Sequence, residues 1–409
     1  MYAELGRVLD MLSVDAARVE AGRRRQEAVW RRQRPDRVPM LLGRSESRQV
    51  AGRVGPQYLR LCEHQLRGGR AVPEYHDFDH YTLGEQFHDP RKMLVEALWD
   101  LVGWARSPGD QQLSLRPNYG VGTVASVFGC GIDTGENDMP WVTDRPDKNE
   151  LLDVDLDRLD RSGLVPRVIE FIRMAREALR PFPQVHVFMP DTQGPINTAF
   201  LLRQQDLFFD MTDDTAYYER LMNVVTEVFI RLTRRFKQEL GEPLDGGCHG
   251  SLYMTGGGVR VVDDVSIMLS PEQYRDQSLP YLRRCLAPFG GGWVHSCGNI
   301  AHHLDTYLST PEIRGINFGE PEYYDFGELM PRFAAADKFC YGGPVRKAGE
   351  PVAAYLERVA AYVRGRENTL IFLPRYGGQD MSEGDWPDPD DTLGLWEAVL
   401  TQSPKREEG

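Results

Sequence analysis

Short apolar runs alternate with amphipathic stretches through the second half of the chain. The runs are four to six residues long and cover 185–189, 291–295, 313–318, 338–341 and 369–373. The turn signal Asp245-Gly246-Gly247 precedes a further expected strand over 248–254. Short apolar runs bounded by turn residues are typical of the buried strands of a parallel sheet.

Helical periodicity fills the intervals between these runs. The clearest helix is expected over 214–240, where apolar residues recur three or four positions apart: Tyr218, Leu221, Met222, Val225, Val228, Phe229 and Leu232. Further helices are expected over 271–287, 299–309 and 350–366, the first of them capped by Ser270. With a strand at 38–42 and one or two near 113–128, about eight strands result. We therefore predict an α/β fold, a (β/α)8 TIM-type barrel with an N-terminal helical extension.

Charge and composition divide the rest of the chain. The protein has 409 residues, with 48 basic and 61 acidic side chains and a formal net charge of −13. Nine acidic and two basic residues lie within 376–409, so much of the excess belongs to the end of the chain. We expect a helical arm over 1–36, the barrel over 37–380 with an insertion near 45–110, and an acidic tail over 381–409.

Several classes of protein are disfavoured. The sequence lacks a strongly basic segment of the kind that binds nucleic acid. It also lacks a run of about 18 apolar residues, the length that a membrane-spanning helix needs. Six cysteines in so long a chain do not form a disulfide framework. We therefore expect reduced thiols and a cytoplasmic location. A cysteine that lies in a site is then a candidate metal ligand or nucleophile.

The segment 293–299, Trp-Val-His-Ser-Cys-Gly-Asn, is the most informative site signal. Residues two apart on a strand share a face, so His295 and Cys297 would both face the barrel mouth. Imidazole nitrogen and thiolate sulfur are zinc ligands, although a buried histidine and a buried cysteine would give the same spacing. Cys340 is the leading third ligand, and the alternatives are Cys130, Cys248 or its neighbour His249, and Glu320.

Other polar residues follow expected strands and are candidates for catalysis or substrate binding. Asp191, Arg375 and Tyr376 are the candidate catalytic residues, and Asn118, Tyr119, Gln193, His249 and Asn299 are the candidate substrate-binding residues. A guanidinium at the end of the last strand suits a carboxylate or phosphate. Asp263 and Asp264 precede a helix, where each is a cap or a pocket acid.

The order of several motifs resembles the uroporphyrinogen decarboxylase superfamily. The motifs are His295-Ser296-Cys297-Gly298-Asn299, Ser270-Pro271-Glu272-Gln273-Tyr274, Pro35-Asp36-Arg37-Val38-Pro39, Asp191-Thr192-Gln193-Gly194-Pro195 and Tyr341-Gly342-Gly343-Pro344. The resemblance covers about residues 20–380. It implies a (β/α)8 barrel whose active cleft lies at the C-terminal mouth.

The resemblance is nearer to the cobamide-dependent methyltransferase branch than to the true decarboxylases. That branch implies Zn2+ held by the His-x-Cys pair and a later cysteine, with a corrinoid carried by a partner protein. The later cysteine belongs on the last strand, where residues 372–376 contain none. A methyltransferase or demethylase acting on a small molecule is the leading hypothesis. A decarboxylase or other lyase and a non-catalytic binding barrel are the alternatives, and a homodimer is expected from the resemblance.

Overall fold

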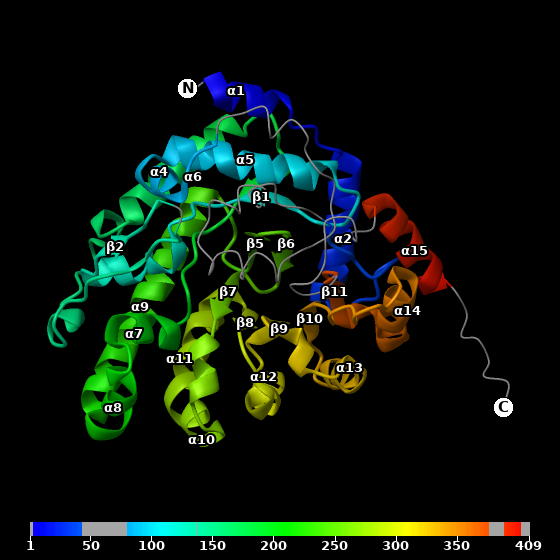
Figure 1. Cartoon of the computed structure of the whole chain (residues 1–409). Helices are drawn as coiled ribbons and strands as arrows, with labels where there is room; N and C mark the ends of the chain where they lie inside the picture. The colour runs from blue at the N-terminus through cyan, green and yellow to red at the C-terminus, as the bar shows by residue number, and fades with distance from the viewer. Residues whose placement is uncertain (1–2, 43–79, 137, 376–387, 402–409) are drawn as a thin grey trace.

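A parallel sheet surrounded by helices forms the centre of the molecule (Figure 1). The computed structural model describes residues 3–42, 80–136, 138–375 and 388–401. Within these ranges five strands pair in the order β11-β10-β9-β8-β7, where β7 is Val259–Val262, β8 Gly292–Ser296, β9 Ile313–Phe318, β10 Phe339–Gly342 and β11 Leu370–Phe372. Consecutive strands of the chain are therefore neighbours, as in successive β/α units.

Two further parallel pairings are present, one at the β11 edge of this sheet and one in a separate two-stranded sheet. Met40 forms a parallel bridge with Phe372, and β1 (Leu113–Leu115) pairs with β4 (Val185–Val187). The mixed α/β architecture is consistent with the predicted TIM-type fold. A closed barrel is not shown, because no ladder joins Met40 to β1, or β4 to β7, within the described ranges.

The strand expected over 248–254 is an antiparallel hairpin instead. Its arms are β5 (Gly246–His249) and β6 (Leu252–Thr255), which pair with each other. Gly250 lies in the turn with a φ of 57°, a left-handed conformation that glycine adopts without strain. The short strands β2 (Ile132–Asp133) and β3 (Trp141–Val142) form another antiparallel pair.

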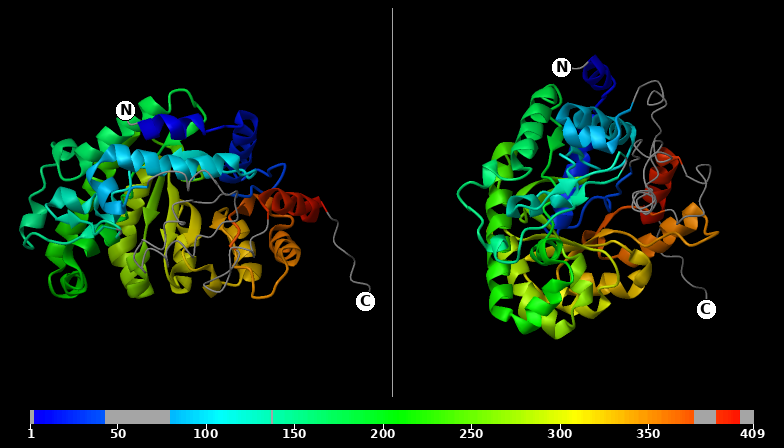
Figure 2. Two further views of the ribbon diagram at one scale, coloured as in Figure 1. Left: turned by 45° about the horizontal axis from the view of Figure 1, so that its top comes forward. Right: turned by 60° about the vertical axis from the view of Figure 1, so that its left-hand side comes forward.

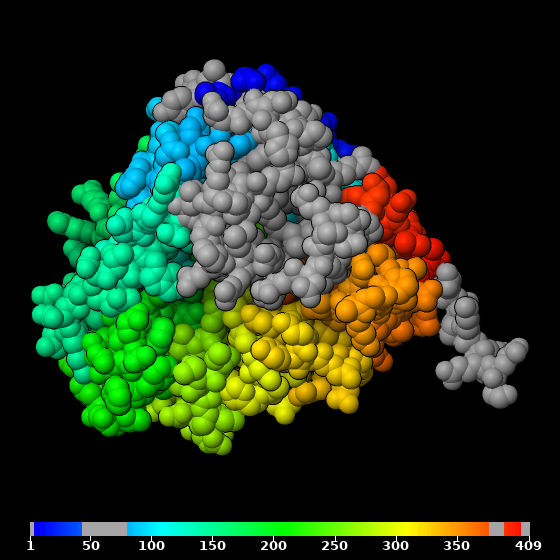
Figure 3. All heavy atoms as spheres, viewed as in Figure 1, coloured from blue at the N-terminus to red at the C-terminus, as the bar shows by residue number. Residues whose placement is uncertain are grey.

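The helices lie outside the strands. They are α1 Ala3–Asp10, α2 Ala16–Trp30, α4 Leu83–His88, α5 Pro90–Arg106, α6 Val165–Ala178, α7 Pro195–Arg203, α8 Asp206–Asp213, α9 Thr215–Leu240, α10 Pro271–Gln273, α11 Leu279–Leu286, α12 Leu304–Ser309, α13 Phe326–Ala335, α14 Val352–Val363 and α15 Pro389–Thr401. The predicted helix over 214–240 is confirmed as α9. In Figure 3, the segments from α8 (green) to α14 (orange) follow one another in chain order along the lower side of the molecule. In both views of Figure 2, α1 and α5 lie side by side, away from α12 and α13.

Two expected helices are interrupted for local reasons. The helix expected over 271–287 contains a π-helical turn over Tyr274–Ser278 between α10 and α11. Pro280 follows that turn and lacks the backbone N–H that a regular helix would bond to the preceding turn. The N-terminal helix divides into α1 and α2, where Asp15 caps the second helix by accepting the Arg18 N–H at 3.0 Å.

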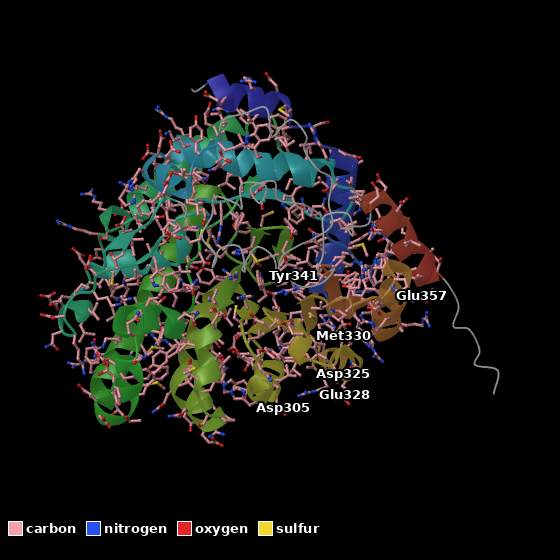
Figure 4. The ribbon with its side chains drawn as sticks, viewed as in Figure 1. Asp305, Asp325, Glu328, Met330, Tyr341 and Glu357 are labelled. Carbon is pink, nitrogen blue, oxygen red and sulfur yellow. The ribbon has the colours of Figure 1, made fainter. Side chains whose placement is uncertain are left out.

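The two faces of the five-stranded sheet pack against different cores. On the inner face lies a cluster, called here the inner cluster, that consists of Val29, Trp30, Leu41, Leu252, Met254, Trp293, Phe339, Tyr341, Ile371 and Leu373. Alternate residues of the same strands, such as Val294, Ile316 and Cys340, belong to the larger helix-facing core. Figure 4 shows Tyr341 near the centre of the molecule, and Asp305, Asp325 and Glu328 on the outer side at α12 and α13.

Helices near both ends of the described chain, α2 and α15, pack against strands. On α2, Trp30 is buried, and its ring lies 4.7 Å from that of Phe339 in the inner cluster. The stretch expected as an acidic tail contains α15, whose Trp396 is fully buried and donates from Nε1 to the Val38 carbonyl at 3.1 Å. The arm and α15 are therefore parts of the folded body.

Of the helices that the structure describes, none combines the length and the apolar character that crossing a membrane requires.

Candidate metal centre

Three potential metal ligands converge at the carboxyl ends of β7 and β8. Val262 on β7 is in register with His295 on β8, so the residues that follow these positions are neighbours. Ligand atoms of Asp264, His295 and Cys297 lie within 4.8 Å of one another. Cys297 Sγ is 3.3 Å from His295 Nε2, which is 3.9 Å from Asp264 Oδ1. The structure therefore brings the two predicted ligands together and adds a carboxylate.

Asn317 on β9 fixes the orientation of His295. The side-chain NH2 of Asn317 donates to the Tyr341 carbonyl at 2.6 Å, so its Oδ1 faces His295 Nδ1, also at 2.6 Å. In the neutral imidazole the proton then lies on Nδ1, and the lone pair of Nε2 is directed at the other two ligands. Burial lowers the pKa of His295, and the nearby Arg260 guanidinium lowers it further. The neutral form, which binds metals, is therefore favoured.

Burial and negative charge make the Cys297 thiol a poor acid in the absence of a cation. Burial raises the pKa of Cys297, and the carboxylates of Asp264 and Glu320 raise it further. The backbone N–H of Cys297 donates to Asp264 Oδ1 at 2.7 Å, and that of Gly298 donates to Glu320. A thiolate here requires a compensating positive charge, which a divalent cation would supply.

Asp264 and Asp263 point to opposite sides of the sheet. Asp264 begins a 3-10 turn, Asp264–Met268, which Asn197 of α7 ties down by accepting the Val265 N–H at 3.1 Å. Asp263 is fully buried and accepts hydrogen bonds at 2.7 Å from Tyr274 and from Tyr307. Burial raises the pKa of Asp263 to about 6. Of the two acids that the sequence left open, Asp264 is the one in the site.

Asp191 anchors a second polar layer that reaches the metal-ligand group through Gln193 and Asn197. Its Oδ1 accepts from Gln193 N at 3.1 Å and Gln193 Nε2 at 2.7 Å. Gln193 has a φ of 56°, a conformation that costs a non-glycine residue energy and is held here by these bonds. Gln193 Oε1 in turn accepts from Asn197 Nδ2 at 3.1 Å, and that Nδ2 lies 3.4 Å from Asp264.

Two guanidinium groups keep Asp191 ionised. Arg260 Nη1 lies 3.3 Å from Asp191 Oδ1, and Arg116 Nη1 lies 3.7 Å from Oδ2. Burial alone would raise the pKa of Asp191, but the two arginines and the Gln193 donors outweigh it and lower the pKa. Asp191 is thus an ion-pair partner rather than a proton acceptor at neutral pH.

His249, at the end of β5, borders the same layer. Its ring lies 4.9 Å from that of Phe188 and 5.4 Å from that of Trp293. Its Nδ1 is buried and has no hydrogen-bond partner among the residues that the structure describes. Burial lowers the pKa of His249 well below its usual value, and Arg260 and Arg116 act in the same direction. The neutral form of the imidazole is therefore favoured.

Cys340, the predicted third ligand, is not part of this group. It lies in the middle of β10, 1% exposed, with Val294 and Ile316 in the helix-facing core. Its neighbours Phe339 and Tyr341 occupy the inner cluster, so the Cys340 side chain is on the opposite face of the sheet. Burial raises the pKa of Cys340 to about 12, which suits a packing residue. The residue that lies beside His295 and Cys297 in the structure is Asp264.

The alternative third ligands lie outside the group as well. Cys130 is buried in the helix-facing core, and burial raises its pKa to about 11. Cys248 is buried in β5, and burial raises its pKa well above the usual value. Glu320 follows β9 and binds the Gly298 N–H, so it supports the loop that follows Cys297.

Most of the remaining predicted site residues have structural contacts. Arg375 donates to the carbonyls of Gly319 at 2.7 Å and Phe318 at 3.3 Å, which ties the end of β11 to the end of β9. Asn299 is exposed and accepts the Ala301 N–H at 3.0 Å, as a helix-initiating residue does. Tyr376 lies outside the described residues.

Asn118 and Tyr119 follow β1 and differ in their surroundings. Tyr119 is fully buried in the helix-facing core, 5.8 Å from the Phe87 ring, and burial raises its pKa. Its hydroxyl therefore does not face the metal-ligand group. The Asn118 N–H donates to Met93 Sδ at 3.1 Å, while the Oδ1 of Asn118 is buried and has no hydrogen-bond partner within the described part of the chain.

Sequence reasoning missed Arg260, Asn317 and Asn197. Arg260 lies on β7, a strand that was not expected although its sequence, Val-Arg-Val-Val, alternates apolar and polar positions after a glycine turn. Asn317 was within the expected strand 313–318, in register with His295. That register depends on the pairing of the strands and has no local sequence signal.

Among known proteins, the chain is similar to solved structures only at the level of the fold. No protein-family model and no curated protein matches the chain. Among solved structures, a methyltransferase from Methanosarcina mazei is similar, with a TM-score of 0.59 and 18% sequence identity. The similarity covers 93% of this chain and 98% of that one. At this level of identity the match shows a shared fold.

Proposed function

We propose that the protein is a metal-dependent methyltransferase that acts on a small molecule at the carboxyl ends of the parallel strands. The convergence of Asp264, His295 and Cys297 on one point is the observation that carries the proposal. The fold that the chain shares with a methyltransferase, and its resemblance to the cobamide-dependent branch, agree with it. A corrinoid on a separate protein is the proposed methyl donor or acceptor.

The donor set suits zinc. One sulfur, one imidazole nitrogen and one carboxylate oxygen are all zinc ligands, and three protein ligands leave a fourth position for a substrate atom. The hydrogen bond from His295 to Asn317 is the outer contact that metal-ligating histidines usually have. When bound, zinc would hold a substrate thiol as a thiolate at neutral pH.

The residues of the chain prepare the site for this chemistry. Asn317 keeps the His295 proton on Nδ1 and so leaves Nε2 as an acceptor. Cys297 gives up its thiol proton when a cation binds. Buried side chains of the inner cluster, including Trp293 and Tyr341, limit the water beneath the site.

Metal analysis of the purified protein tests the proposal. Protein prepared without added metal is expected to contain about one zinc ion per chain, and His295→Ala to contain almost none. His302→Ala, which changes an exposed histidine, serves as the matched control. The activity is tested with methylcobalamin and a small thiol, where demethylation changes the visible spectrum. Metal-free wild-type protein, or equal turnover by His295→Ala, would contradict the proposal.

A further inference from the structure

Asp263, the residue before the metal-ligand candidate Asp264, is a buried acid. Its side chain is fully buried, and within the described ranges it forms no ion pair. One of its carboxylate oxygens, Oδ1, has no hydrogen-bond partner among the same residues. Burial of an acid without a cation costs free energy, and an apolar side chain of similar size would avoid that cost. The bonds of the other carboxylate oxygen and of the backbone therefore account for an acid at this position.

The Oδ2 atom of Asp263 joins two helical elements on the helix-facing side of the sheet. The hydroxyl groups of Tyr274 and Tyr307 both donate to it, each at 2.7 Å. Both tyrosines are fully buried, and their rings lie 5.5 Å apart and almost perpendicular. Tyr307 lies in α12, and Tyr274 begins the π-helical turn Tyr274–Ser278. Such turns are rare in helices and frequently occur at functional sites.

The backbone of Asp263 connects these tyrosines to the end of β8. Its N–H donates to the His295 carbonyl at 2.8 Å, and its carbonyl accepts from Ser296 Oγ at 3.2 Å. Ser296 lies between His295 and Cys297 in the chain and is fully buried. Asp263 itself is followed directly by Asp264. Each candidate ligand is thus bonded to Asp263 or adjacent in the chain to a residue that is.

Ser266 and His303 attach the 3-10 turn Asp264–Met268 to the same group. Ser266 Oγ donates to the Asp263 carbonyl at 2.6 Å and lies 3.0 Å from the Tyr307 hydroxyl. His303 Nε2 donates to the Ser266 carbonyl at 2.8 Å. Ser266 and His303 are both fully buried. The turn is therefore held to α12 and to the residue that precedes this helix.

We propose that Asp263, Tyr274 and Tyr307 form a positioning group that sets the spacing of the three metal-ligand candidates from the opposite side of the sheet. None of the three contributes a ligand atom. The two hydroxyl groups hold the carboxylate, and the carboxylate fixes the backbone of residue 263. That backbone holds the ends of β7 and β8 in the arrangement that brings the ligand atoms within 4.8 Å of one another. The effect on a bound metal rests on the proposed function, whereas the ordering of the two strand ends needs no metal.

Variants that remove single hydroxyl groups test the positioning group. Tyr274→Phe and Tyr307→Phe each keep the ring and lose one bond to Asp263. Each should bind zinc about three- to tenfold more weakly, and the double variant about 10- to 100-fold, the range typical of outer contacts of metal ligands. Tyr217→Phe is the matched control, because Tyr217 is equally buried and its hydroxyl donates to the Lys148 carbonyl at 2.8 Å. It should lose a similar amount of stability in urea unfolding and keep its zinc affinity within about twofold.

Cobalt(II) in place of zinc gives a readout that a loss of stability alone does not change. The visible absorption bands of bound cobalt(II) depend on the number and geometry of its ligands. These bands should differ from the wild type in Tyr274→Phe and Tyr307→Phe, and should match the wild type in Tyr217→Phe. The single variants carry this test even where the double variant does not fold. Wild-type zinc affinity and an unchanged cobalt spectrum in both single variants would overturn the inference.

Hydrogen exchange of the metal-free protein separates this inference from the proposed function. In Tyr274→Phe and Tyr307→Phe, the amides of residues 263–268 and 295–298 should exchange faster than in the wild type, while those of α9 keep their rates. This result supports the positioning group even where the protein binds no metal and the proposed function fails. Bound zinc, with wild-type affinity and wild-type exchange in both variants, gives the reverse result. It overturns the positioning group and leaves the proposed function in place.

Discussion

Cys297, directly after β8, and Cys340, on β10, show how the alternation of side chains along a strand separates a potential metal ligand from a packing residue. Both strands belong to one buried parallel sheet. Cys297 lies on the inner face, 3.3 Å from His295, whereas Cys340 faces the helices among Val294 and Ile316. A shift of one position along a strand moves a side chain to the other face. Whether a cysteine can act as a metal ligand here thus depends on the face of the sheet on which its side chain lies.

Exchanging the two cysteines for alanine gives the largest expected contrast. Cys297→Ala should weaken zinc binding by more than about 100-fold, because it removes one of three protein ligands. Cys340→Ala should leave zinc affinity within about twofold and cost roughly 1–2 kcal/mol of stability through the small cavity it creates. Zinc titration against a chromogenic chelator measures the affinity, and urea unfolding measures the stability. A large loss of zinc affinity in Cys340→Ala would remove the distinction between the two faces.

Substitution of Asn317 tests whether its hydrogen bond to His295 contributes to metal affinity. Asn317→Ala should lower zinc affinity about 10- to 100-fold, since the hydrogen bond that holds His295 is lost. Asn299→Ala, which changes an exposed asparagine beyond β8, is the control and should have little effect. The same chelator titration applies to both variants. Equal effects in the two variants would show that Asn317 has no orienting role.

The pH dependence of zinc binding follows from the state of Cys297. Burial, Asp264 and Glu320 raise its pKa, so the thiol is protonated at neutral pH before metal binds. His295 has a lowered pKa and is already neutral there. Zinc uptake at pH 7 should therefore release about one proton, and affinity should rise about tenfold per pH unit. Calorimetry in buffers of different ionisation enthalpy measures this number, and a value near zero would mean that Cys297 is not a ligand.

Arg375 gives the smallest expected effect. Because its guanidinium binds the carbonyls of Gly319 and Phe318, Arg375→Ala should cost about 1–2 kcal/mol of stability. Zinc affinity should stay unchanged. Urea unfolding measures the stability, and the chelator titration measures the zinc affinity. A loss of turnover without a loss of stability would return Arg375 to the candidate catalytic residues.

Local sequence patterns predicted the elements of the fold better than the site. The apolar run at 313–318 and the periodic helix at 214–240 are present as β9 and α9, because each has a signal within its own residues. The same local reasoning placed His295 and Cys297 on one face, which needs only the two-residue repeat of a strand.

The choice of Asp264 and the role of Arg260 required information that no local pattern contains. All four residues of β10 are buried, so the phase of Cys340 cannot be inferred from alternation. Asp263 and Asp264 are equally polar, and only their neighbours, Tyr274 and Tyr307 for one and Cys297 for the other, distinguish them. Arg260 pairs with an aspartate 69 positions away in the chain, a contact that tertiary structure alone creates.

X-ray absorption of the zinc-loaded protein tests the central claim most directly. The geometry of Asp264, His295 and Cys297 predicts one sulfur neighbour at about 2.3 Å from zinc, with nitrogen and oxygen neighbours at about 2.0–2.2 Å. The single sulfur contribution should disappear in Cys297→Ala and persist in Cys340→Ala. Two sulfur neighbours in the wild type, or no change in Cys297→Ala, would contradict a centre built from these three residues.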